Sequence, residues 1–377
     1  MRPLSAERAL LEARLPGFDG RLAALGIDGA EDPDNEVIEE FRRAGGGNLF
    51  VPRELGGAGL GCHDGVRLQR AVGSRAPALA VATTMHHYKV AWLAAALGAD
   101  AAGVLRGIAE KNLLVASCGA EGQVGRSLFA PGIRVAAAGG GLTVSGTKRP
   151  CSLTRSMGLL SLTATTPDGT APDGTAPDGR LLMLVIPADA PGIRREPFWR
   201  NRVLRATQTD AVVLDEVFVP ESMIIPIGDP ALSPGRFTSN LLWFQLLITA
   251  SYLGVATGQV EELYTAGRGT PGDRVAALAP LETVAAALEA LAREVDEGRC
   301  DDDLLGRSLL VRHTAQRAIA EATDRALELA GGMPFVTGSQ GVDALAASRG
   351  LAFHPPSEIS AREPLDTWLG GGGLTLT

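Results

Sequence analysis

Two side chains near the C-terminus are suited to proton transfer. His354 and Glu358 lie in the segment FHPPSE. An imidazole has an unperturbed pKa of about 6.5, so it can accept or donate a proton at neutral pH. The rigid pair of Pro355 and Pro356 bends the chain and can present Glu358 to the same site. The plainer alternatives are a structural histidine at a helix end and a solvated carboxylate beside Arg362.

The sequence gives little support for a metal site or for a nucleotide-binding site of a common type. The chain has four cysteines, Cys62, Cys118, Cys151 and Cys300. They form no CxxC pair, which argues against a disulfide framework and against a zinc site. His86 and His87 are adjacent, so on a helix they point about 100° apart and make poor joint metal ligands. The one GxGxxG pattern, GRGTPG at 267–272, does not follow a predicted strand, and there is no Walker A sequence, so a Rossmann or P-loop site is not expected either.

The overall charge and the apolar runs limit the partners and the location that this protein can have. The net charge is -8 and the pI is about 5.3, with no run rich in Lys and Arg, so a nucleic-acid partner is not expected. The N-terminus has no apolar core of signal-peptide length. The longest apolar run, about 241–255, is shorter than the roughly 20 residues that a membrane span needs. These features predict a cytoplasmic protein with no membrane span.

The elements that must position these residues fall into three regions. Residues 1–111 carry apolar residues at three- and four-residue spacing, which predicts an N-terminal helical domain. Residues 112–226 contain short apolar or alternating runs separated by Gly, Pro and Asp, which predicts a central β-domain. Residues 227–377 return to long segments of helical periodicity that suit an antiparallel bundle. The predicted class is therefore α+β with several domains.

This order of domains, together with four segments, resembles the acyl-CoA dehydrogenase family. Arg205, Thr207 and Thr209 reproduce the family's Arg-x-Ser/Thr-x-Thr spacing ahead of an Asp-x-Val-x-Val-Pro strand. The resemblance implies FAD bound between a β-barrel-like domain and a C-terminal four-helix bundle. It also implies a homodimer or homotetramer in which a neighbouring subunit completes each FAD site. The segments are VPRELGGAGLG (51–61), LTVSGTKRPCS (142–152), LRATQTDAVVLDEVFVP (204–220) and ELAGGMPF (328–335).

The resemblance implies contacts to the flavin ring. Ser152 falls at the position of the family's flavin-facing Ser or Thr, although the family's nearby Trp is Pro150 here. Ser117 and Cys118 begin the segment at the place of a family motif that hydrogen-bonds the pyrimidine ring. An ordinary strand-to-loop turn is the alternative for these two residues.

It also implies contacts to the pyrophosphate. Arg268 matches an arginine of the family, and a guanidinium suits a phosphate through bidentate hydrogen bonding. Gly331 and Gly332 match a turn in which glycine lets the backbone approach the phosphates. Glu328 replaces a family glutamine there, and its carboxylate would repel the pyrophosphate.

The family's catalytic base does not appear at the matching positions. Pro355 stands where the usual glutamate belongs, and the earlier helix that carries the glutamate in some relatives has Phe244 and Gln245. Dehydrogenation of an acyl thioester requires a base within about 3 Å of the α-proton. His354 and Glu358 are therefore the candidate substitutes.

Three functions remain open at the level of sequence. The leading prediction is an FAD-dependent oxidoreductase that acts on an acyl-CoA or acyl-carrier-protein thioester, with an unidentified electron acceptor. The first alternative is a flavin monooxygenase of the same fold, which needs no α-proton base and would depend on a flavin reductase and on O₂. The second is a catalytically silent or non-redox member of the family.

Overall fold

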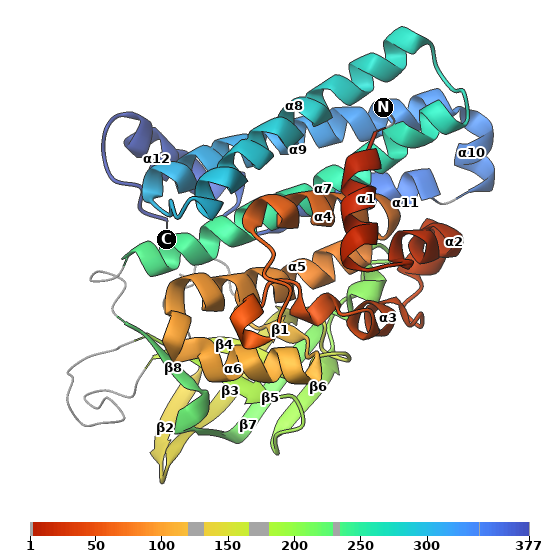
Figure 1. Ribbon diagram of the computed structural model, residues 1–377. Coiled ribbons are helices and arrows are strands. Elements are labelled where there is room, and N and C mark those ends of the chain that lie inside the picture. The colour runs from red at the N-terminus through yellow and green to blue at the C-terminus, as the bar shows by residue number, and fades with distance from the viewer. Residues whose placement is uncertain (1–2, 120–131, 166–180, 229–233, 339, 377) are drawn as a thin grey trace.

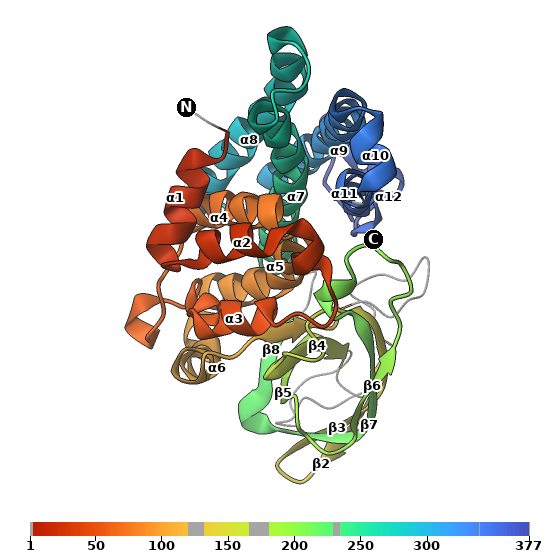
Figure 2. The same cartoon turned by 90° about the vertical axis from the view of Figure 1, so that its right-hand side faces the viewer.

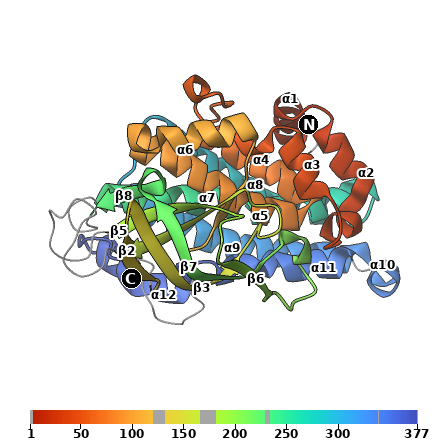
Figure 3. The same cartoon turned by 90° about the horizontal axis from the view of Figure 1, so that it is seen from below.

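The computed structural model describes residues 3–119, 132–165, 181–228, 234–338 and 340–376 of the chain. Within these ranges an N-terminal helical part precedes a β-barrel-like part, and a second helical part follows (Figure 1). This organisation is the α+β class predicted from the sequence. In Figure 1 the barrel lies below the helices, and Figure 3 shows it from that side.

The N-terminal part surrounds one helix that is buried along its length. Every residue of this helix, α5, except Met85 is buried, because apolar and small side chains occur on all of its faces. It begins at Pro77, whose fixed φ suits the first turn of a helix. The helices of this part are α1 (Ser5–Arg14), α2 (Phe18–Glu31), α3 (Val37–Arg43), α4 (Cys62–Arg75), α5 (Pro77–Trp92) and α6 (Gly98–Lys111).

The central part contains two four-stranded sheets, in the orders β1-β4-β5-β8 and β2-β3-β7-β6. Only β1 pairs in parallel, with β4, and the other described pairs are antiparallel. The two sheets curve around a shared apolar interior (Figure 2). The strands are β1 (Val115–Ser117), β2 (Arg134–Ala138), β3 (Gly141–Cys151), β4 (Leu159–Thr165), β5 (Leu181–Pro187), β6 (Ile193–Pro197), β7 (Asp210–Pro220) and β8 (Ile224–Gly228).

The C-terminal part is built around one long central helix, α7, which packs against α4, α5, α8, α9 and α11. Thr270 and Asp273 form a capping box that starts α8, and Asp301 caps α9. The elements of this part are α7 (Pro234–Thr265), α8 (Pro271–Asp296), α9 (Asp302–Ala330), α10 (Gly332–Thr337), α11 (Gln340–Ser348), the 3₁₀-helix η6 (Arg349–Phe353) and α12 (Glu358–Leu369).

Two glycines allow the N-terminal and C-terminal helices to touch at their backbones. A Cβ atom on Gly73 of α4 would lie 2.1 Å from the carbonyl oxygen of Ser251 on α7. A Cβ atom on Gly254 of α7 would lie 2.2 Å from the carbonyl oxygen of Arg70 on α4. Both helices therefore depend on glycine at the crossing, because any larger residue would push them apart.

Three helical stretches are long and apolar enough to cross a membrane, at 77–111, 235–265 and 271–296. In 235–265, 94% of the most apolar window is buried inside the protein, so packing already uses its apolar side chains. The corresponding figures are 44% and 39% for the other two. The absence of a membrane span and the cytoplasmic location remain predictions.

Candidate active site

A cavity of about 370 Å³ lies between the barrel and the helices α5 and α7. One face of α5 contributes residues at three- and four-residue spacing, from Val81 to Trp92, and α7 lines the opposite side. Most of the surface is apolar. The lining residues are Val81, Met85, Tyr88, Lys89, Trp92, Ser117, Gly119, Pro150, Ser152, Thr163, Leu181, Met183, Trp199, Leu204, Thr207, Thr209, Ile227, Phe237, Asn240, Leu241, Phe244, Tyr252, Gly350, Phe353, His354 and Pro355.

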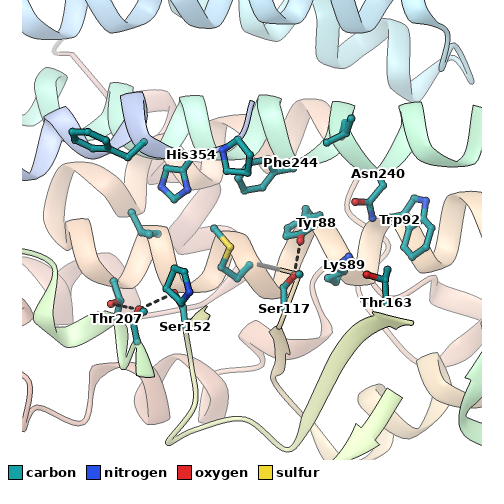
Figure 4. A pocket seen from close by; sticks show the side chains of 18 of the residues that line it. Tyr88, Lys89, Trp92, Ser117, Ser152, Thr163, Thr207, Asn240, Phe244 and His354 are labelled. Carbon is teal, nitrogen blue, oxygen red and sulfur yellow. Dashed lines mark hydrogen bonds between the residues drawn. The ribbon is translucent and has the colours of Figure 1, made fainter. Parts of the chain in front are cut away.

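His354 lines one end of the cavity (Figure 4), as the sequence suggested. Its Nε2 lies 3.0 Å from the hydroxyl of Tyr252, and its ring packs against Phe244 and Tyr252. Burial, reinforced by the nearby Arg312 guanidinium, lowers the pKa of His354 to about 3. The imidazole is therefore neutral at neutral pH and acts as a hydrogen-bond partner rather than as a strong base.

Arg312 of α9 supports the backbone of the segment that carries His354. The sequence had not indicated a role for this arginine. Its fully buried guanidinium donates hydrogen bonds to the carbonyl oxygens of Leu351, at 2.8 Å, and of His354, at 2.5 Å. It also bonds Gln245, whose amide nitrogen donates to the carbonyl oxygen of Pro355 at 3.0 Å. Burial lowers the pKa of Arg312 to about 10, so it stays charged at neutral pH. The sequence signal for this role was an arginine at a position of the predicted helix where the periodicity places apolar residues.

A chain of hydroxyl groups lies at the same end as His354. Ser152, directly after β3, hydrogen-bonds the hydroxyl of Thr209 at 2.9 Å. Thr209 in turn lies 2.7 Å from the hydroxyl of Thr207, which donates to the carbonyl oxygen of Leu204. All three hydroxyl-bearing residues line the cavity, and they include Ser152 and two residues of the motif noted in the sequence.

The other end of the cavity contains Tyr88, Lys89, Trp92 and Asn240 (Figure 4). The hydroxyl of Tyr88 hydrogen-bonds that of Ser117 at the end of β1. Burial lowers the pKa of Lys89 to about 7, because a charged ammonium loses hydration there. The sequence singled out Ser117 but not Tyr88 or Lys89, and several other polar residues on the same helix leave these two without a distinctive signal.

The remaining predicted residues lie elsewhere in the chain. Glu358 starts α12, outside the cavity, where its carboxylate pairs with Arg317 at 3.6 Å and with Arg362 at 3.4 Å. Cys118 is buried but does not line the cavity, and its thiol lies near that of Cys151. The functional roles of these two residues remain predictions.

The predicted pyrophosphate contacts do not reach the cavity within one chain. Arg268 lies exposed in the turn between α7 and α8. Gly331 and Gly332 stand at the junction of α9 and α10, beside a separate hollow that Glu328 also lines. Segment 120–127, which follows Cys118 in the predicted ring-binding motif, lies outside the described residues. These contacts also remain predictions.

The charge of the cavity limits its chemistry. None of the described residues that line it is an Asp or Glu, so the part of the chain that the structure covers supplies no carboxylate base. The described residues also contain no cluster of three or more His, Cys, Asp or Glu that could hold a metal ion. The titratable groups at its wall are Tyr88, Lys89, Tyr252 and His354.

Comparison with known proteins indicates the family to which this chain belongs. No family model matches the chain. Isobutylamine N-hydroxylase of Streptomyces viridifaciens is 34% identical over 386 residues, covering 100% of both chains. Three solved structures have the same fold. KijD3, in complex with FMN and a dTDP-linked amino sugar, has a TM-score of 0.80 and 22% identity over 97% of this chain and 94% of its own.

The second is a nitrososynthase from Micromonospora carbonacea var. africana, with a TM-score of 0.79 and 21% identity over 98% of this chain and 97% of its own. The third is FMN-bound TdsC from Paenibacillus sp. A11-2, with a TM-score of 0.78 and 21% identity over 99% and 98% of the two chains. TdsC is a dibenzothiophene monooxygenase.

The chain therefore has the acyl-CoA dehydrogenase-like fold. Its full-length similarity shows that the chain belongs to the family of isobutylamine N-hydroxylase. The predicted membership in the acyl-CoA dehydrogenases proper was wrong. The motifs behind that prediction, such as Thr207 and Thr209 ahead of β7, build a fold that both groups share, so they do not distinguish dehydrogenation from oxygenation.

Proposed function

We propose that this protein is a flavin-dependent monooxygenase that hydroxylates the nitrogen of a primary amine. The observation that carries the proposal is its similarity, along the whole chain, to isobutylamine N-hydroxylase. The lack of a carboxylate among the described lining residues supports it, because N-hydroxylation requires no removal of an α-proton. The monooxygenase alternative thus replaces acyl-thioester dehydrogenation as the leading hypothesis.

A flavin ring suits the His354 end of the cavity. The hydroxyls of Ser152, Thr207 and Thr209 offer hydrogen bonds to its polar edge, and Pro150 and Leu204 offer apolar surface to its faces. FAD is not confirmed as the cofactor, and the KijD3 and TdsC structures of this fold contain FMN. FMN lacks the pyrophosphate for which Arg268, Gly331 and Gly332 were proposed. We therefore propose FMN.

A bound flavin would supply the redox chemistry, which is the activation of O₂ by the reduced ring. The protein supplies a dry, enclosed site in which side reactions with water are suppressed. Tyr252 and His354 provide a neutral hydrogen-bonding pair at that end of the cavity. We expect a separate reductase to supply reduced flavin, because the one GxGxxG pattern, at 267–272, joins the helices α7 and α8 and does not follow a strand as in a Rossmann nicotinamide site.

The cavity also favours the reactive form of the substrate. Oxygen transfer needs the lone pair of a neutral amine, whereas a free alkylamine is protonated at neutral pH. Lys89 indicates how an alkylammonium behaves in this environment, since burial lowers its pKa to about 7. A substrate amine that is buried without a carboxylate partner experiences the same loss of hydration and releases its proton more readily.

The test supplies FMN, a flavin reductase with NADH, and isobutylamine to the purified protein under ¹⁸O₂. We expect the alkylhydroxylamine to carry one ¹⁸O atom, as detected by mass spectrometry. A parallel anaerobic experiment offers acyl-CoA thioesters to the protein with oxidised flavin. Bleaching of the flavin by a thioester, with no hydroxylated amine from a panel of primary amines, would refute the proposal. The homodimer or homotetramer remains a prediction, to be checked by light scattering.

A further inference from the structure

The end of the cavity opposite His354 contains a buried lysine that pairs with no carboxylate among the residues the structure describes. Lys89 is 6% exposed, and its Nζ lies 4.9 Å from the centre of the Tyr88 ring and 5.3 Å from that of Trp92. Within the described part of the chain, its ammonium makes no hydrogen bond and no ion pair. The two rings stabilise the charge through cation–π contacts but leave its hydrogen-bond donors unused.

The surroundings of Lys89 offer further hydrogen-bond donors. The Nδ2 of Asn240 on α7 is buried without a hydrogen-bond partner and belongs to the same cavity wall. Thr163 of β4 adds a hydroxyl group, and Figure 4 shows it close to Lys89 at this end. The indole nitrogen of Trp92 already donates to the carbonyl oxygen of Arg236, at 2.8 Å. This end of the cavity therefore has unused donors, to which an acceptor group of a ligand can bind.

A buried ammonium also orients an amine substrate. Lys89 and a substrate amine cannot both carry a charge at low cost where water is excluded, so an orientation that places the amine away from Lys89 is favoured. The far end, at His354 and Ser152, has no cationic side chain among the described lining residues, and the nearby Arg312 guanidinium is already bonded to backbone carbonyl oxygens. The part of the substrate that faces Lys89 must then be an acceptor, and an anion satisfies both the charge and the donors.

From this arrangement we propose, on the basis of the proposed function, that the natural substrate is an amino carboxylate. Its carboxylate binds Lys89, Asn240 and Thr163, and its amine points towards the His354 end. This distinguishes the chain from an enzyme for which a purely aliphatic amine such as isobutylamine is the best substrate.

The test compares ω-amino carboxylates, from 3-aminopropanoate to 6-aminohexanoate, with unsubstituted alkylamines of the same chain lengths. In the reductase-coupled assay, we expect at least one amino carboxylate to exceed its matched alkylamine in kcat/KM by about ten- to a hundredfold. Lys89→Met should abolish this preference, mainly through a higher KM for the amino carboxylate. Lys111→Met, at an exposed lysine that ends α6, is the matched control and should behave as the wild type.

Calorimetry provides a readout that does not depend on turnover. The preferred amino carboxylate should bind the wild-type protein and bind Lys89→Met about ten- to a hundredfold more weakly. If Lys89→Met fails to fold, Asn240→Leu and Thr163→Val remove the other proposed donors and should weaken binding in the same direction. Oxidation of alkylamines in preference to every amino carboxylate would overturn this inference and leave the proposed function standing. Failure to hydroxylate any amine of either series would refute the proposed function itself.

Discussion

At the scale of single residues, the neutral state of His354 makes a prediction about pH. Its pKa of about 3 lies far below the ordinary value for histidine, because burial removes the hydration of the charged ring. Between pH 5 and 8 the imidazole stays neutral, so the pH profile of kcat/KM should show no inflection that disappears in His354→Gln. ¹⁵N chemical shifts of the ring nitrogens would measure the same property directly. An imidazole that titrates near pH 6.5 would contradict the prediction.

Arg312 gives a second prediction at this scale. A lysine keeps the charge but cannot reproduce the planar fork that reaches the carbonyl oxygens of Leu351 and His354 together. Arg312→Lys should therefore lower the free energy of unfolding by about 1 to 3 kcal/mol, as unsatisfied buried carbonyls do, and should reduce turnover. Urea unfolding measures the first effect. The exposed Arg317, one turn further along α9, is the control, and Arg317→Lys should change neither quantity.

At the scale of elements, the crossing of α4 and α7 fixes the wall of the cavity. The Gly254→Ala substitution places a Cβ 2.2 Å from the carbonyl oxygen of Arg70, so the two helices must separate. We expect a loss of about 1 to 3 kcal/mol in the free energy of unfolding, measured in urea, because overpacking displaces a close backbone contact.

Gly103 in α6 provides the matched control for this crossing. A Cβ there meets nothing within 4 Å, and alanine favours the helix over glycine. Gly103→Ala should therefore stabilise the protein by about 0.5 to 1 kcal/mol. A Gly254→Ala variant as stable as the Gly103→Ala variant would show that the helices are not in backbone contact.

At the scale of the whole molecule, Glu31 joins the helical part to the loop that lines the cavity. Its carboxylate accepts hydrogen bonds from the backbone nitrogens of Ala78, at 2.6 Å, and Leu204, at 3.1 Å. Burial raises the pKa of Glu31 to about 7, so its protonation stabilises the fold fully below about pH 4.5. That contribution is lost as the pH rises to about 7.

The Glu31→Gln variant does not titrate, so it isolates this contribution. The wild-type protein should be more stable relative to this variant at pH 5 than at pH 8, by about 1 to 3 kcal/mol. Thermal or urea unfolding across this range measures the difference. A difference that grows with pH would contradict the assignment, since it would require a lowered pKa for this carboxyl.

The sequence by itself determined the order of the three parts and the class of the fold. Helical and strand periodicities depend on neighbouring residues alone, so they could be followed from residues 1–111 through 112–226 to 227–377. It also directed attention to His354 and Ser152, which the structure brings to the same cavity. The missing acid at Pro355 was visible as well, but the sequence did not decide between a substitute base for dehydrogenation and a monooxygenase.

Only the tertiary structure decided the electrostatics of the cavity. The neutral state of His354, the buried charge of Lys89 and the support from Arg312 all depend on residues that are distant in sequence and that remove water from these groups. Local sequence cannot reveal desolvation, because the burial of one side chain is set by elements that pack against it from elsewhere in the chain. For the same reason, Glu358 looked equivalent to His354 in the sequence, although it lies in α12 outside the cavity.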